Sequence, residues 1–449
     1  MSNSKEDIKF SLKATVNKKK VLFAEVDGTF ADVLLSFLTL PLGTVVEILK
    51  KHLQFGSLTS LYTGLANIDS VHFWAEGAKS ILLHPQSSSD ASCKKLKLDV
   101  SDSSLLEFFY YPKKCICEAR FQSTTMHHDN LGRCKRCFSS PTEREEAKNK
   151  TRTVPCYDGV FMKTTSSFLI TDNLQIMPNA GLLQIASVLG ATNMDEAETM
   201  NVTFGLYEVM ELLMYSLISM NPLSAIILDA RLEYIKGTEF IADASNSNFN
   251  TMNLKLMVQK STNKLLYAEA EEDFVDFLFS FLTIPLGVVV SLLSLNSHVK
   301  AIDNLYKSAA DLIHDKYFKN LDAKTRLLKP KIPYGYASKN HIFLLIEDIY
   351  SGGVVIASTN IPKGKGNYLK GPRSYKVTDD LTVTPFCIVP IISSLNEEKV
   401  PLSDIEEVEL QIGLKEGLSI LKASLTSKCA LTDALLSQIL NRKRKREDV

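Results

Sequence analysis

The stretch SFLTLPLGTVV (Ser36–Val46) occurs a second time, almost unchanged, as SFLTIPLGVVV (Ser280–Val290). The second copy lies 244 positions after the first, and the register holds without a gap from Leu22 to Tyr62. Between Leu22 and Leu49, 16 of 28 residues are identical in the two copies. This identity at a constant offset indicates that the chain is a tandem duplication. We interpret the rest of the sequence on that basis, because a repeat defines the units of a fold.

Two further blocks extend the duplication. ITDNLQIMP (Ile170–Pro178) matches VTDDLTVTP (Val377–Pro385) at an offset of 207, and a block starting at Gly205 matches one starting at Gly413 at an offset of 208. The fall from 244 to 207 means that the first copy carries about 37 extra residues between its blocks. The expected domains are a first copy at 8–230, a linker at 231–253, a second copy at 254–437 and a basic tail at 438–449.

Each copy has the pattern of an α+β unit. Apolar and polar residues alternate in KFSLKATV before a lysine-rich turn, which predicts a β-hairpin. A three-and-four apolar spacing over Asp27–Leu38 predicts a helix that Pro41 breaks. A second hairpin is expected to turn at Asp172 and Asn173. With further strands expected near Ile81–His84 and Leu96–Val100, we predict hairpins packed on short helices. Such a unit would be β-grasp-like, with two small subunits in each copy.

Composition limits the class of protein. The 449 residues include 51 basic and 51 acidic side chains, so no overall field favours nucleic acid or acidic substrates. The first residues, MSNSKEDIKF, lack the apolar run of a secretory signal. We therefore expect a cytoplasmic or nuclear protein that is not secreted, whose cysteines are thiols or metal ligands.

The repeated apolar phrase could also be read as a membrane segment. Its uncharged run is 14 residues long in the first copy (Val33–Val46) and 21 in the second (Phe277–Ser297). A spanning helix needs about 20 residues, and Pro285 and Gly287 interrupt the longer run. Because homologous units should share one environment, we expect no membrane span.

The motifs LLSFLTLPLGTVV, KGPRSYKVTDDLTVTP and IGLKEGLSILKASLTSKCALT give the chain a family resemblance. It resembles, over nearly its whole length, the plant family built around the domain of unknown function 674. The resemblance implies plant origin and a duplicated domain. Since the role of that family is unassigned, it implies no catalytic residue.

A cysteine cluster falls in the extra segment of the first copy, at about 112–150. Sixteen residues separate the pair Cys115 and Cys117 from the pair Cys134 and Cys137. Two close pairs can present four thiolates to one tetrahedral zinc ion, as in a zinc ribbon. Because the first pair is C-x-C, His127 or His128 could replace one cysteine. We predict one structural zinc ion, and the alternative is a set of free thiols.

Two classes of function remain open. Carboxylates recur at Glu25 and Asp32 and at their copies Glu269 and Asp276, so an enzyme could use them in a site between the two halves. No histidine or lysine recurs beside them, however, and acidic residues at helix starts also interact with the helix dipole. We therefore favour a non-catalytic binding or scaffold protein that contacts protein partners.

The C-terminal end is strongly basic. NRKRKREDV contains five consecutive cations: Arg442, Lys443, Arg444, Lys445 and Arg446. Such a run is typical of nuclear import signals and of tails that bind nucleic acid. A solvated end of the chain is the simpler interpretation.

Overall fold

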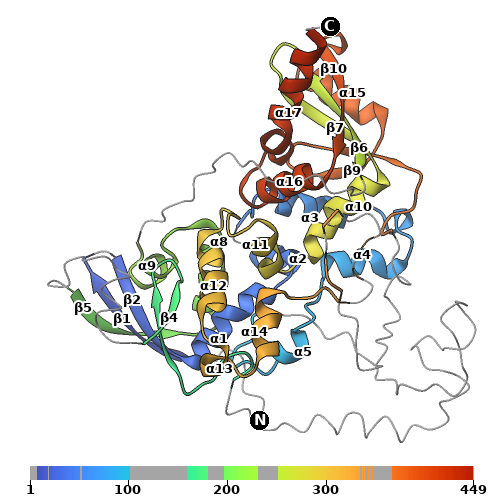
Figure 1. Ribbon diagram of the computed structural model, residues 1–449. Coiled ribbons are helices and arrows are strands. Elements are labelled where there is room, and N and C mark those ends of the chain that lie inside the picture. The colour runs from blue at the N-terminus through green and yellow to red at the C-terminus, as the bar shows by residue number, and fades with distance from the viewer. Residues whose placement is uncertain are drawn as a thin grey trace, which may run out of the picture.

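The computed structural model describes most of both copies. The described residues are 8–18, 20–50, 53–101, 159–179, 197–230, 251–333, 336, 338, 342–343, 345–347 and 367–447, and their side chains are described up to 440 except at position 76. Figure 1 shows two sheets at opposite ends of the molecule with helices between them.

Each copy contributes one five-stranded sheet. The first sheet has the order β4-β3-β2-β1-β5, and the second has the order β9-β8-β7-β6-β10. Every pairing within them is antiparallel. The strands of the first sheet are β1 (Phe10–Asn17), β2 (Lys20–Asp27), β3 (Ser167–Thr171), β4 (Ile176–Pro178) and β5 (Ala197–Phe204). Those of the second are β6 (Met252–Gln259), β7 (Leu265–Glu271), β8 (Ser374–Val377), β9 (Val383–Pro385) and β10 (Ile405–Ile412).

This layout agrees with an α+β duplication and corrects two details of the sequence prediction. Both hairpins of a copy join one sheet, because β3 pairs with β2, so the described residues form two sheets and not four subunits. The strands expected at Ile81–His84 and Leu96–Val100 are wrong. Residues 81–83 end a helix, residues 96–98 form a bend, and residues 99–100 have no regular secondary structure. The predicted β-grasp-like unit included those two strands, so the structure gives no support for it.

The helices follow a common plan in both copies. In the first copy they are α1 (Gly28–Ser36), η2 (Phe37–Thr39), α2 (Leu42–Leu49), α3 (Leu58–Asn67), η3 (Ser70–His72), α4 (Glu76–Leu83), α5 (Asp90–Cys93), α8 (Leu206–Ile218) and α9 (Pro222–Ile227). In the second copy they are α10 (Glu272–Ser280), η4 (Phe281–Thr283), α11 (Leu286–Leu292), α12 (Lys300–Asp311), α13 (His314–Tyr317), α14 (Leu321–Leu328), α15 (Ile388–Glu397), η5 (Leu402–Asp404), α16 (Leu414–Thr426) and α17 (Ala430–Glu447). In the described residues, no helix combines the length and the apolarity that a membrane crossing requires.

The two copies of the repeated phrase bind each other. Pro41 and Pro285 form an antiparallel bridge. The amide of Leu42 donates to the carbonyl of Ile284 at 2.9 Å, and the amide of Leu286 donates to the carbonyl of Leu40 at 2.9 Å. The contact therefore has an approximate two-fold symmetry, and the phrase is buried because it forms the junction between the copies.

The glycines of the phrase allow this close approach. A Cβ atom on Gly43 would lie 3.0 Å from the carbonyl oxygen of Leu282, and one on Gly287 would lie 3.0 Å from that of Leu38. Each contact is with the backbone of the other copy, which cannot rotate away as a side chain could. Proline suits the position before each helix because it has no N–H to leave unsatisfied.

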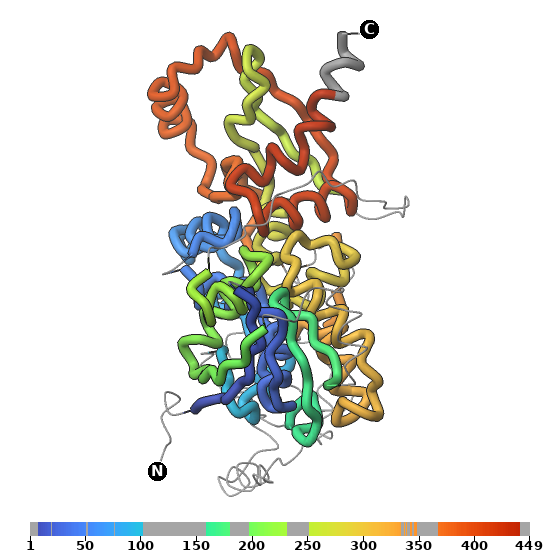
Figure 2. Tube along the Cα trace, turned by 90° about the vertical axis from the view of Figure 1, so that its left-hand side faces the viewer, coloured from blue at the N-terminus to red at the C-terminus, as the bar shows by residue number. Residues whose placement is uncertain are grey.

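Beyond the junction, the two copies exchange helices. Helix α3 of the first copy contacts β9 of the second sheet, and α4 packs against η4 of the second copy. In the same way, α12 of the second copy contacts β4 of the first sheet, and α14 packs against η2 of the first copy (Figures 1 and 2). Antiparallel bridges mark the two crossing points, Phe73 with Leu369 and Met162 with Phe318. We call these the 73/369 crossover and the 162/318 crossover.

Contacts at the second hairpin of each sheet complete the exchange. In the first sheet, the Ser308 hydroxyl of α12 accepts a hydrogen bond from the Ile176 amide of β4 at 2.8 Å. In the second sheet, the equivalent residue of α3 is Gly64, whose Cβ position lies 2.9 Å from the amide nitrogen of Val383 in β9. Each spatial unit therefore combines the sheet of one copy with helices of the other.

The junction predicts the effect of adding one methyl group. Gly287→Ala should lower the free energy of unfolding by about 1–3 kcal/mol, because the methyl group meets backbone carbonyls on two sides. Ser291→Ala, at an exposed position of the same helix, is the matched control and should be nearly neutral. Urea denaturation checks both, and equal stability of the two variants would contradict the close approach.

Candidate functional site

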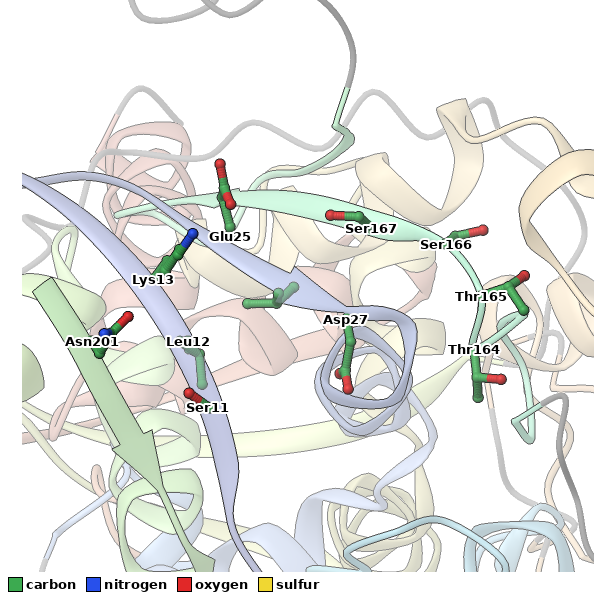
Figure 3. A pocket seen from close by; sticks show the side chains of 11 residues that line it. Ser11, Leu12, Lys13, Glu25, Asp27, Thr164, Thr165, Ser166, Ser167 and Asn201 are labelled. Atoms are coloured by element: carbon green, nitrogen blue, oxygen red, sulfur yellow. The ribbon is translucent and has the colours of Figure 1, made fainter. Parts of the chain in front are cut away.

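A polar pocket lies on the outer face of the first sheet. Its volume is about 430 Å³, and it is lined by residues from β1, β2, β5, the start of β3 and the segment before β3. Figure 3 shows Asn201 at one side, Lys13 and Glu25 on neighbouring strands, and Thr164 and Thr165 at the other side. All of these residues belong to the first copy, so the pocket does not lie between the two halves.

Strand register places the polar groups of the pocket in one row. Lys13 is the cross-strand partner of Glu25 on β2 and of Asn201 on β5. Side chains paired in this way lie close enough to interact, and opposite charges stabilise the pair. Asp27 also lines the pocket, but its carboxylate accepts the Phe30 amide at 2.9 Å as the N-cap of α1. The pocket thus offers one cation, one carboxylate, one amide and several hydroxyls to a polar ligand.

Asp32, a duplicated carboxylate predicted from the sequence, lies in the core instead. Its side chain is 2% exposed. Its oxygens accept hydrogen bonds from the amides of Val160 at 2.6 Å, Phe161 at 2.9 Å and Met162 at 2.9 Å. These amides lie in the 162/318 crossover, so Asp32 fixes the backbone that receives the exchanged helices.

Asp276 repeats this arrangement in the second copy. It is fully buried and accepts the amides of Tyr368 at 2.9 Å and Leu369 at 3.0 Å. Burial raises the pKa of Asp32 to about 6 and that of Asp276 to about 8, against the opposing effect of the amide donors. The sequence prediction joined Glu25 with Asp32, but the structure separates them into a surface pocket and a core contact.

Lysines at both crossovers have the same structural role. The Lys163 ammonium donates to the Asp315 carbonyl at 2.5 Å, and the Lys370 ammonium donates to the Val71 carbonyl at 3.0 Å. Each lysine thus binds the exchanged segment of the other copy. The sequence offered a signal for this role, because a lysine occurs at the equivalent position of both copies.

A second pair of aspartates joins each β-hairpin to the end of its copy. Asp172 accepts the Ser224 amide at 2.8 Å and the Ser224 hydroxyl at 2.6 Å. Asp379 accepts the Thr432 amide and hydroxyl, both at 2.8 Å. The sequence placed these aspartates only in turns, since a turn residue gives no sign of a partner about 50 positions away.

The predicted zinc ligands lie outside the described residues, namely Cys115, Cys117, Cys134, Cys137, His127 and His128. Within the described part, no group of three or more histidine, cysteine or acidic residues could hold a metal ion. The backbone of the basic run Arg442–Arg446 belongs to α17, while its side chains are not among those that the structure describes.

Comparison with known proteins identifies a family and no further relative. The family model described as "Protein of unknown function (DUF674)" matches residues 4–414 and 365–449. No curated protein and no solved structure gives a significant match.

The raised pKa of Asp276 predicts how stability depends on pH. An unfolded aspartate has a pKa of about 3.9, so between pH 4 and 8 the folded protein holds a proton that the unfolded chain has lost. Stability from this group is therefore fully present below pH 4 and is lost as the pH rises toward 8. The difference in unfolding free energy between wild type and Asp276→Asn should fall by an amount on the order of 5 kcal/mol across this window, since each pKa unit corresponds to about 1.4 kcal/mol. Urea denaturation at pH 4, 6 and 8 measures it, and a difference that is constant with pH would contradict the assignment.

Proposed function

The chain belongs to the DUF674 family, and from that premise we propose that it is a non-catalytic binding protein whose first sheet receives an extended segment of a protein partner. The observation that carries this proposal is the edge strand β5. It is eight residues long, ends the first sheet, and is exposed at four consecutive positions from Glu198 to Asn201. A long exposed edge offers unpaired backbone donors and acceptors to another chain.

The corresponding edge of the second sheet is less suited to this role. Strand β10 carries three acidic side chains, Glu406, Glu407 and Glu409, and charges on an edge strand oppose pairing with another chain. On the outer face of the second sheet, Ile391 and Leu395 of α15 also pack on Tyr267. β5 has one charged residue, Glu198, so the first copy has the more accessible edge.

The polar pocket beside this edge would determine which side chains of the partner fit. Asn201 belongs to both β5 and the pocket, and Lys13 is its partner on β1. An added strand would place alternate side chains beside this row, because side chains alternate between the two faces of a sheet. Since the row consists of charged, amide and hydroxyl groups, the matching side chains of the partner are polar.

The enzyme alternative has less support from the geometry. It requires Glu25, Asp32 and their copies to share a site between the halves. Asp32 and Asp276 are instead buried and bound to backbone amides, and Glu25 lines a pocket of the first copy alone. A buried carboxylate that accepts several amides has no free geometry for proton transfer to a substrate.

Peptide selection tests the proposal. Decapeptides selected by display against the full chain should bind wild type, and the double variant Thr199→Lys with Asn201→Lys should weaken them about tenfold or more by repelling the edge. Glu407→Lys on β10 is the matched control and should leave affinity unchanged. Fluorescence anisotropy measures the affinities, and peptides insensitive to the β5 variant would refute the proposed edge.

Two further proposals rest on the sequence. One is a structural zinc ion in the cysteine cluster, and the other is nuclear import through Arg442–Arg446. Native mass spectrometry of the purified chain should show one zinc per chain, which is lost when Cys134 and Cys137 are both changed to Ser, because tetrahedral sites need four ligands. Cys387→Ser, at an exposed thiol of the second copy, should retain the zinc. A metal-free wild type would contradict the site.

A further inference from the structure

The two crossovers are equivalent in backbone but differ in chemistry. Around the 73/369 crossover, four positions carry polar groups: His72, Glu272, Arg373 and Tyr375. The equivalent positions around the 162/318 crossover are Tyr317, Gly28, Ser166 and Phe168. There, Phe168 and Tyr317 form a ring pair at 5.6 Å, so the fold does not require the polar set. The duplication therefore provides an internal control that separates structural residues from specialised ones.

Three of the four polar side chains of the 73/369 crossover are hydrogen-bond donors. The Arg373 guanidinium lies 3.1 Å from Nδ1 of His72. Because arginine only donates, Nδ1 must accept, and the neutral imidazole then carries its proton on Nε2. Burial and the Arg373 charge lower the pKa of His72, which favours this neutral form. His72 thus presents an N–H and Arg373 its remaining N–H groups.

The third donor is the hydroxyl of Tyr375. Its ring meets the His72 ring edge-on, with the centroids 6.2 Å apart. The residue is fully buried, and among the described residues its hydroxyl has no hydrogen-bond partner. A buried hydroxyl without a partner costs stability, so its presence where the other copy has Phe168 calls for a compensating role.

The Arg373 guanidinium has an acidic neighbour, Glu272, with which it forms no ion pair. In the described part of the chain, its guanidinium takes part in none of the ion pairs. The nearby carboxylate of Glu272 accepts the backbone amide of Arg373 at 3.2 Å, and the Lys370 ammonium is bound to the Val71 carbonyl. The cluster therefore combines the Arg373 cation and two neutral donors with one carboxylate, Glu272, which already accepts a backbone amide.

We propose that Arg373, His72 and Tyr375 form a binding site for a tetrahedral oxyanion, such as a phosphate group carried by a ligand. Charge-assisted hydrogen bonds from arginine to phosphate oxygens are among the strongest in proteins. The donors come from η3 of one copy and from β8 and its preceding loop in the other, so the site exists only because the helices are exchanged. It lies at the second sheet and is independent of the peptide edge on β5.

The intrinsic fluorescence of the protein can test this site. Trp74, its single tryptophan, is two residues from His72 and 62% exposed. Fluorescence of the full-length protein should change saturably with inorganic phosphate. Acetate and sodium chloride at matched ionic strength should give no such change. Arg373→Gln should weaken phosphate binding about tenfold or more and Tyr375→Phe about fivefold, in line with the strengths of charged and neutral hydrogen bonds.

Control variants keep the result interpretable. Tyr317→Phe, at the position equivalent to His72, should leave phosphate affinity unchanged. Without phosphate, Tyr375→Phe should melt at the same or a higher temperature than wild type, because it removes an unpartnered buried hydroxyl. The site would be overturned by a response that acetate or chloride reproduces, or by phosphate binding that survives Arg373→Gln.

Discussion

The antiparallel contact between the two Pro-Leu-Gly segments is the constraint on which the rest of the structure depends. Its two reciprocal hydrogen bonds, between Leu42 and Ile284 and between Leu286 and Leu40, place the start of α2 against the start of α11. The chain then leaves each segment toward the opposite copy. As a result, α3 and α12 reach the second hairpin of the other sheet. Asp276 and Asp32 hold the backbone of the two crossovers.

Much of this fold could be predicted from the sequence, but the exchange could not. The duplication, the hairpins and the break at Pro41 are local features with clear patterns. The choice of partner sheet is not local, because α3 and α12 have apolar faces that suit either copy. The strand expected at Ile81–His84 failed for a related reason, since a short apolar run fits a helix end as well as a strand. The sequence partly indicated that Asp32 is buried, because it is the single acidic residue in an apolar helix.

The pocket and the oxyanion cluster were harder to predict than the core. Lys13, Glu25 and Asn201 come together through strand register, and Asn201 is separated from the other two by more than 170 positions. His72 and Arg373 belong to different copies and meet only through the exchange. Residues shared by the copies build the junction, whereas residues that differ between them give each sheet its own chemistry. A duplicated fold can in this way keep one architecture and carry two distinct surfaces.

The most direct test of the exchange is a disulfide across the 73/369 crossover. The amide of Trp74 donates to Tyr368 and that of Lys370 to His72, so Phe73 and Leu369 form a non-hydrogen-bonded pair, whose Cα atoms are about 4.5 Å apart. This spacing permits a disulfide. In the double variant Phe73→Cys with Leu369→Cys, mild oxidation should link the two introduced thiols in peptides identified by mass spectrometry. Folded protein in which these two thiols remain unlinked would show that the segment between α3 and α4 does not pair with the second copy.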